Sequence, residues 1–92
     1  MAVTVRIPTQ LRELSGGASE VTAGGGTVAT VLAELEVAHP GFSERLFDEG
    51  GQLRRFVNVF VADEDIRFLD GINTPVGEGE TVSIVPAVAG GA

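Results

Sequence analysis

A single helix-forming segment stands between segments that alternate like strands, and this pattern limits the folds open to the chain. Apolar side chains recur at the helical spacing i, i+3, i+4, i+7; they are Val28, Val31, Leu32 and Leu35. Thr27 precedes them as a predicted N-cap. The run His39-Pro40-Gly41 is predicted to end the helix, because proline disfavours the α conformation in the residue before it. A lone helix with one apolar stripe needs a sheet to cover that stripe.

The remaining apolar residues follow the period of two that is typical of half-buried strands. The predicted strands are residues 3–8, 18–23, 56–61 and 81–85, with a short return strand at 66–68 after a turn at 63–65. Between them we expect a short helical turn over 42–47, with Leu46 and one Phe inward, and a polar loop over 48–52. The first two strands are close enough in sequence to form an antiparallel hairpin.

This order of elements predicts an α+β fold, in which one mixed sheet is covered on one face by a helix. The first and last strands can be parallel and central, because a long right-handed crossover separates them. That arrangement is the β-grasp, or ubiquitin-like, fold. The helix should cover the face that carries Val3, Val5, Ile7, Val57, Val59, Val82 and Ile84. We expect residues 1–86 to form this domain and residues 87–92 to form a flexible C-terminal tail with few contacts.

The composition argues against several classes of function. A chain of 92 residues has room for one modest core, and a net charge of −7 disfavours nucleic acid as a partner. No segment approaches the length of a membrane span, and the N-terminus alternates like a strand where a signal peptide would be apolar, so we expect a cytoplasmic protein. The sequence has no Cys and no Lys, so its side chains offer no thiol and no primary amine as a nucleophile.

The sequence has no strong catalytic motif. The run Gly24-Gly25-Gly26-Thr27 lacks the Lys of a phosphate-binding loop, and Asp63-Glu64-Asp65 lacks the Gly and Glu of a calcium loop. His39 has no second His or Cys with which to share a metal, and its place at the end of the helix favours an interaction with the helix C-terminus. A triad of Ser43, His39 and Asp48 has no support in the spacing. We therefore expect a protein that binds no metal or cofactor and is not an enzyme on its own.

The last seven residues, Pro86-Ala87-Val88-Ala89-Gly90-Gly91-Ala92, carry neither charge nor a large side chain. They directly continue the apolar strand that precedes them. Small residues let an extended backbone enter a narrow channel, because Gly has no Cβ to collide with the walls. Such a tail can serve as a substrate for a partner enzyme.

Several stretches together resemble the ThiS/MoaD family of sulfur carriers, the prokaryotic relatives of ubiquitin. They are Val5–Thr9 with Leu11-Arg12, Arg55–Val61, Asp63–Phe68 and Pro86–Gly91. The resemblance covers nearly the whole chain and is strongest to the carriers of the thiocarboxylate route to cysteine. It implies that an E1-like enzyme uses ATP to adenylate the carboxylate of Gly91, and that a sulfur donor then leaves a thiocarboxylate there. The tail residues Val88, Ala89 and Gly90 would lie in the channels of the partners.

The resemblance also implies partners. A biosynthetic enzyme accepts the sulfur, in the cysteine route a pyridoxal-phosphate (PLP) enzyme of the cysteine-synthase type, and a zinc metalloprotease releases the product. The sequence also leaves open another sulfur-containing metabolite as the destination of the sulfur. Ala92 departs from the family pattern, because it blocks Gly91; we expect a precursor from which the same type of protease trims Ala92, the alternative being that Ala92 is not native. Beside the tail, Phe60 and Val85 are expected to form an exposed apolar docking patch, with Asn58 and Arg6 nearby, unless a loop covers Phe60.

Two other functions remain open at this stage. The chain can be the small subunit of a molybdopterin-synthase-like complex, whose tail is inserted into a large subunit. It can also be a β-grasp interaction module with an inert tail. Conversion of the C-terminus to a thiocarboxylate is expected for the sulfur carrier and for the small subunit, but not for the interaction module.

Overall fold

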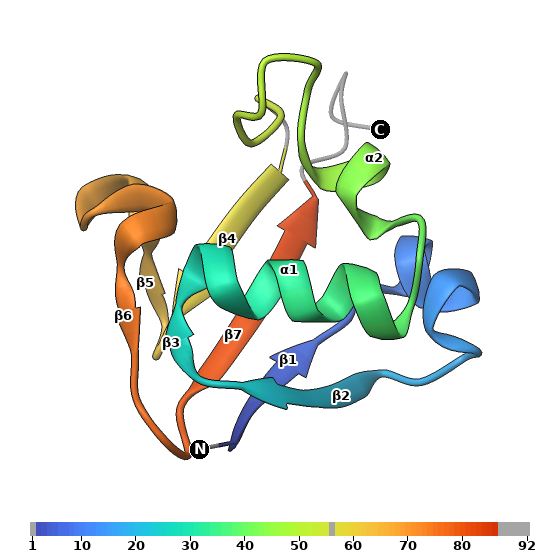
Figure 1. The fold of residues 1–92 in the computed structure, drawn as a ribbon, viewed down its shortest axis with the longest axis horizontal. Coiled ribbons are helices and arrows are strands. Elements are labelled where there is room, and N and C mark those ends of the chain that lie inside the picture. Colours follow the sequence, from blue (N-terminus) through green and yellow to red (C-terminus); the bar gives the residue numbers. More distant parts are fainter. Residues whose placement is uncertain (1, 56, 87–92) are drawn as a thin grey trace.

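The protein is described by a computed structural model that covers residues 2–55 and 57–86 (Figure 1). The main sheet has the strand order β2-β1-β7-β4-β5. Its strands are β1 (Ala2–Arg6), β2 (Glu20–Gly24), β4 (Val57–Val61), β5 (Glu64–Asp65) and β7 (Thr81–Pro86). A second sheet of two short strands pairs β3 (Gly26–Thr27) with β6 (Pro75–Val76).

The strand pairing confirms the mixed sheet. β1 and β2 form the expected antiparallel hairpin, and β1 runs parallel to β7, with Val5 opposite Val82. β7 is antiparallel to β4, with Val59 opposite Ile84. β7 is therefore the central strand, paired on both sides, and it ends at Pro86 directly before the tail. This topology is the predicted β-grasp arrangement.

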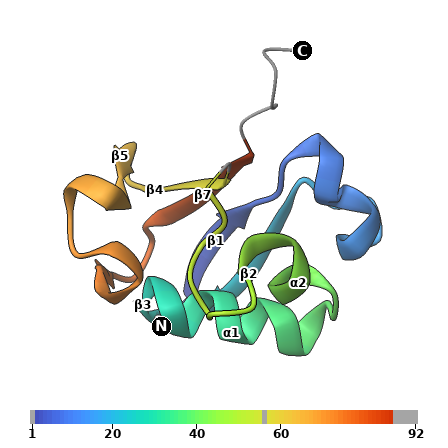
Figure 2. The same cartoon turned by 90° about the horizontal axis from the view of Figure 1, so that it is seen from above.

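The helix α1 (Val28–Ala38) lies across one face of the sheet (Figures 1 and 2). The hydroxyl of Thr27 accepts a hydrogen bond from the backbone N–H of Thr30 at 3.2 Å, which confirms the predicted N-cap. The helix ends at Ala38 with His39 as its C-cap, which confirms the predicted stop at residues 39–41. Its four predicted apolar residues are all buried. They pack in one core with the inward side chains of the sheet, which are Val3, Val5, Ile7, Val57, Val59, Val82 and Ile84.

A short helix, α2 (Phe42–Leu46), closes one end of the core. Phe42 and Leu46 are buried, at 0% and 1% exposure, as the expected helical turn with one inward Phe requires. The carboxylate of Glu36, in α1, accepts hydrogen bonds from the backbone N–H groups of Ser43 at 2.7 Å and Gly41 at 3.2 Å. Glu36 thereby satisfies donors at the start of α2 that have no partner within that helix. The end of α1 is tied to the start of α2 by this one side chain.

The predicted return strand at 66–68 is wrong. The chain reverses earlier, at Ala62 and Asp63, which have φ angles of 51° and 71°. Two consecutive residues of positive φ form the kind of tight turn that matches the twist of a two-stranded hairpin. The return strand is therefore β5, at Glu64–Asp65, and Ile66–Phe68 forms the 3₁₀ turn η2. The Asp65 side chain accepts a hydrogen bond from the backbone N–H of Arg67 at 2.8 Å, which favours the turn over a longer strand.

Three further elements were not expected from the sequence. They are the sheet of β3 and β6 and the 3₁₀ segments η1 (Thr9–Ser15) and η3 (Gly71–Asn73). The pairing of β3 with β6 joins the start of α1 to the segment before β7, with Gly26 opposite Val76 and Thr27 opposite Pro75. A strand of two residues is too short to show an alternating apolar pattern, so β3 and β6 could not be predicted from the sequence. In the described residues no helix has the length and apolar character that crossing a membrane demands.

Candidate functional site

The face of the sheet turned away from α1 is a mostly polar surface that leads to the C-terminal end of β7. The strand pairings place one row of side chains across all the strands of this face. The row consists of Glu20, Arg6, Ser83, Phe60 and Asp65. Arg6 and Glu20 form an exposed ion pair at 3.6 Å. The next position along β7 toward the tail is Val85, which lies opposite Asn58.

Val85 and Phe60 are the apolar residues of this outer face near the end of β7. The side chain of Val85 is 45% exposed, and Phe60 is partly buried. The pairing of β4 with β7 places them on diagonally neighbouring positions, since Asn58 faces Val85 and Phe60 faces Ser83. Asn58 and Arg6 lie on the same face, as expected. The geometry thus brings together the residues of the expected docking patch, and whether a partner binds there stays a prediction.

Arg67 joins the η2 turn to the strand β4. Its guanidinium donates hydrogen bonds to the side-chain oxygen of Asn58 and to the backbone carbonyls of Val57, at 2.9 Å, and Arg55, at 3.1 Å. Arg67 therefore provides hydrogen-bond donors to carbonyls at the start of β4, and it holds the Asn58 side chain beside Val85. Sequence reasoning missed this role, because bonds that span nine residues or more leave no local pattern.

The chemical centre of the expected site lies outside the described residues. Val88, Ala89, Gly90, Gly91 and Ala92 all fall in the segment 87–92. The expectation that residues after Pro86 make few contacts concerns the same segment. What the structure places is the strand that delivers the tail: β7 is central, hydrogen-bonded on both sides, and buried on its inner face at Val82 and Ile84.

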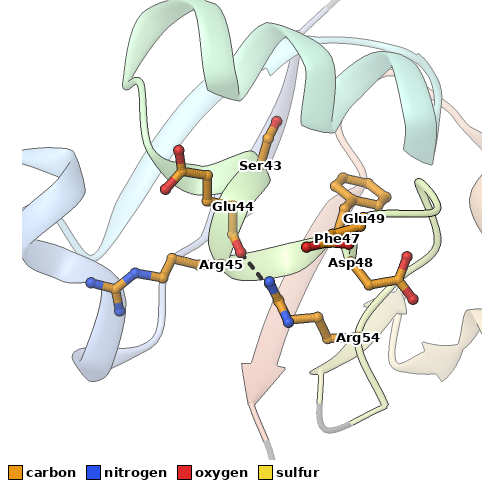
Figure 3. A pocket seen from close by; sticks show the side chains of 7 residues that line it. All are labelled: Ser43, Glu44, Arg45, Phe47, Asp48, Glu49 and Arg54. Carbon is orange, nitrogen blue, oxygen red and sulfur yellow. Dashed lines mark hydrogen bonds between the residues drawn. The ribbon is translucent and has the colours of Figure 1, made fainter.

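A shallow hollow of about 530 Å³ lies at α2 and the loop that follows it (Figure 3). It is lined by Ser43, Glu44, Arg45, Phe47, Asp48, Glu49 and Arg54. Arg54 Nε donates a hydrogen bond to the carbonyl of Glu44 at 3.1 Å, and Arg45 pairs with Glu13 at 3.6 Å. Both cations are thus engaged within the protein. The hollow mixes charges of both signs and does not assemble a nucleophile with a base.

The other residues weighed as chemical candidates occupy structural positions. His39 is the C-cap of α1, where its ring meets the edge of Phe42 with ring centroids 6.5 Å apart. The backbone N–H of Ser43 is bonded to Glu36, and the pKa of Glu36 is lowered from its ordinary value, chiefly by that hydrogen bond and next by the one from Gly41. Asp48 Oδ1 accepts from the backbone N–H groups of Gly50 and Gln52 in its own loop. In the described part of the chain, no group of three or more His, Cys, Asp or Glu residues is arranged to hold a metal ion.

Comparison with known proteins extends over the whole chain. A model of the ThiS family matches residues 5–91. The chain is 50% identical to the sulfur carrier protein CysO of Mycobacterium tuberculosis over 93 aligned positions, which cover 99% of this chain and 100% of that protein. It is 35% identical to a putative sulfur carrier protein of Archaeoglobus fulgidus, again over 99% of this chain and 100% of the relative.

Solved structures show the same fold. The crystal structure of the Amycolatopsis orientalis BexX/CysO complex contains a chain that is 48% identical and superimposes with a TM-score of 0.91, covering 97% of this chain and 99% of that one. The crystal structure of Mycobacterium tuberculosis CysO superimposes with a TM-score of 0.89 at 49% identity, covering 94% of this chain and 99% of that one. The described fold and the match from residue 5 to Gly91 agree on one conclusion: this chain belongs to the ThiS family.

Proposed function

We propose that this protein is a sulfur carrier that holds sulfur as a thiocarboxylate on the carboxyl carbon of Gly91. The observation that carries the proposal is the family match, which runs through the β-grasp domain and on to the glycine pair Gly90-Gly91. The identity to sulfur carrier proteins over the full length of both chains supports it. The protein acts as a cosubstrate, and its partners perform the catalysis.

The chemistry needs an activating enzyme because a carboxylate is a poor electrophile. In the proposed cycle, a carboxylate oxygen of Gly91 attacks the α-phosphorus of ATP on an E1-like enzyme, and pyrophosphate leaves. A sulfur donor then attacks the carbonyl carbon of this acyl-adenylate, and AMP leaves with the electron pair of the broken C–O bond. The product is a thiocarboxylate. The carrier itself has no Cys and no Lys that could attack the activated carbonyl.

The fold suits this role because a hydrogen-bonded domain is followed in the chain by a segment of small side chains. β7 is paired with β1 on one side and β4 on the other, so the strand that ends at Pro86 is a fixed base for the tail. The tail contains no side chain larger than Val88. A narrow channel can admit such a segment, and the body supplies the surface by which a partner distinguishes this carrier from another small chain.

The partners follow from the cycle. They are an E1-like adenylyltransferase and sulfurtransferase, a sulfur-accepting biosynthetic enzyme, and a zinc metalloprotease that removes Ala92 so that Gly91 bears the carboxylate. The relative from Amycolatopsis orientalis forms a complex with BexX, which is a precedent for a carrier that binds a partner protein. For the acceptor we favour a pyridoxal-phosphate enzyme of the cysteine-synthase type, because the similarity to CysO covers the whole chain.

Mass spectrometry tests the proposal directly. A chain that ends at Gly91 is incubated with the E1-like enzyme of the same organism, ATP and sulfide. Exchange of one carboxylate oxygen for sulfur adds about 16 Da, as acyl activation followed by sulfur attack requires. A chain that ends at Gly90 is the matched control, since it keeps the domain and lacks the reacting residue; it should stay unchanged. If the chain ending at Gly91 also gains no mass with active enzyme, the protein is not a carrier of this kind, and the inert-tail interaction module takes its place.

A further inference from the structure

The segment η2 follows β5, which is the edge strand at the side of the sheet opposite β2 (Figure 1). It carries a second exposed apolar surface. Its centre is Phe68, whose side chain is 86% exposed, next to Leu69, which is 40% exposed. We call these two residues the η2 tip. Exposing an aromatic ring to water has an unfavourable free energy, which burial against a partner relieves. Phe is also among the side chains that most often anchor the centre of protein interfaces.

The backbone that carries the η2 tip is held in place on both sides. Before the tip, Ile66 is buried at 1% exposure and the guanidinium of Arg67 is bonded to β4. After it, the backbone N–H of Asp70 donates to the hydroxyl of the buried Thr74 at 3.1 Å. A partner that binds Phe68 therefore spends little free energy on ordering this segment.

Acidic residues flank the η2 tip in the chain, and we call them its border. Asp63, Glu64 and Asp70 are exposed and lie within five residues of Phe68 in the chain. The one cation of this stretch, Arg67, has its guanidinium committed to three acceptors on the protein itself. With a net charge of −7 on the whole chain, the tip offers an apolar centre with a negative border. Its complement is an apolar pocket bordered by Arg or Lys.

We propose that the η2 tip is a second surface by which the carrier docks on its activating enzyme, in an apolar pocket with a basic border. This inference rests on the proposed function. The activating enzyme has to bind a strongly anionic carrier before the tail can reach ATP, and a basic docking surface on that enzyme both attracts the carrier and complements the acidic border. The tail offers only small side chains to bind, so affinity and selectivity have to come from a surface on the folded domain.

Steady-state kinetics of ATP–pyrophosphate exchange test this docking role. The carrier, ending at Gly91, is varied at saturating ATP with the E1-like enzyme of the same organism. The variants are Phe68→Ser and, as the matched control, Val37→Ser, which replaces another strongly exposed apolar residue, 83% exposed, on α1. We expect Phe68→Ser to raise the KM for the carrier about tenfold with kcat unchanged, because an anchor that binds ground and transition states equally contributes to KM alone. Val37→Ser should leave both constants within twofold.

A charge variant tests the border separately. Replacing Asp63, Glu64 and Asp70 with the corresponding amides should raise the KM for the carrier at low NaCl concentration. It should also make that KM depend less on NaCl, because the variant lacks the charge attraction that salt screens. An unchanged KM for Phe68→Ser, in a variant whose circular dichroism matches that of the wild type, overturns the docking role. If Phe68→Ser raises the KM for the carrier with the sulfur-accepting enzyme but leaves it unchanged with the activating enzyme, the choice of partner is wrong. If wild-type carrier supports no exchange at all, the proposed function fails and this inference fails with it, so the two failures are distinguishable.

Discussion

The guanidinium of Arg67 donates a hydrogen bond to the side chain of Asn58, the residue that stands opposite Val85 on the strand leading to the tail. Arg67 belongs to η2 and Asn58 to β4. This bond therefore connects the segment that carries the η2 tip with the outer face of the sheet beside the C-terminal end of β7. The same hydrogen bond therefore links the two surfaces that we propose for partner docking, the η2 tip and the patch of Phe60 and Val85.

Removal of the Arg67 side chain should destabilise the domain measurably. Arg67→Met leaves two backbone carbonyls and the Asn58 oxygen without this donor, and we expect the free energy of unfolding to fall by about 1–2 kcal/mol, since the groups are partly solvated. Arg45→Met is the matched control, because Arg45 makes a single exposed ion pair with Glu13; its effect should stay under about 0.5 kcal/mol. Urea unfolding followed by circular dichroism measures both. Equal effects would show that the bonds of Arg67 contribute no more than a surface pair.

The contrast between Phe42 and Phe68 tests the assignment of core and surface. Phe42 is fully buried and Phe68 is 86% exposed. Phe42→Ala should lower the free energy of unfolding by about 3–5 kcal/mol through lost burial and the cavity left behind. Phe68→Ala should change it by less than about 0.5 kcal/mol, as exposed substitutions usually do. Thermal or urea melts of the two variants decide the matter, and a strongly destabilised Phe68→Ala would mean that Phe68 is part of the core.

Glu36 should make the stability of the domain depend on pH in the acidic range. Backbone N–H groups of Ser43 and Gly41 lower the pKa of Glu36 from its ordinary value of 4.5. A carboxyl with a lower pKa in the folded state stabilises the protein above the unfolded-state pKa, and this contribution disappears as the pH falls through the folded-state pKa. Glu36→Gln should therefore cost stability at pH 7, with the difference from wild type shrinking toward pH 3. Glu78→Gln, at an exposed loop carboxylate, is the comparison. A difference that stays constant from pH 7 to pH 3 would rule out the charge as its source.

Phe60→Ala tests the patch beside the tail. Phe60 is only partly buried, so the variant should still fold, and its conversion to thiocarboxylate by the E1-like enzyme should be slower at low carrier concentration. Rates are compared by mass spectrometry against Val37→Ala, on the opposite side of the domain's sheet. If the folded Phe60→Ala variant is converted as fast as the wild type, Phe60 and Val85 are not a docking patch for that enzyme.

The length of the C-terminus should control adenylation. One extra residue moves the reacting carbon by up to about 3.5 Å, and the Cβ of Ala92 adds bulk in a channel suited to Gly. Three chains are compared with the E1-like enzyme, ATP and sulfide: the full sequence to Ala92, a chain ending at Gly91 and a chain ending at Gly90. We expect rapid thiocarboxylate formation only for the chain ending at Gly91. Equal rates for the first two chains would show that Ala92 is tolerated and that trimming is not required.

The sequence by itself determined the architecture, because the apolar periodicities are strong and agree with each other. The stripe on α1 and the alternation in β1, β4 and β7 each specify which face is buried, and a one-residue change of register would expose every core Val on those strands. The capping hydroxyl of Thr27 and the break at Pro40 are local chemistry that the sequence displays openly. The tail pattern that led to the sulfur-carrier family is likewise a property of consecutive residues.

Tertiary structure decided the features that depend on contacts distant in sequence. The turn at Ala62 and Asp63, and with it the change of residues 66–68 from strand to 3₁₀ turn, follows from the hairpin's twist and from the Asp65 cap, which no alternation records. The exposure of Phe68 is invisible in composition, where an aromatic residue suggests the core. Only the fold shows that Ile66 fills the core position, that Arg67 reaches back to β4, and that Phe68 is left facing water, because burial is a property of what packs against a residue.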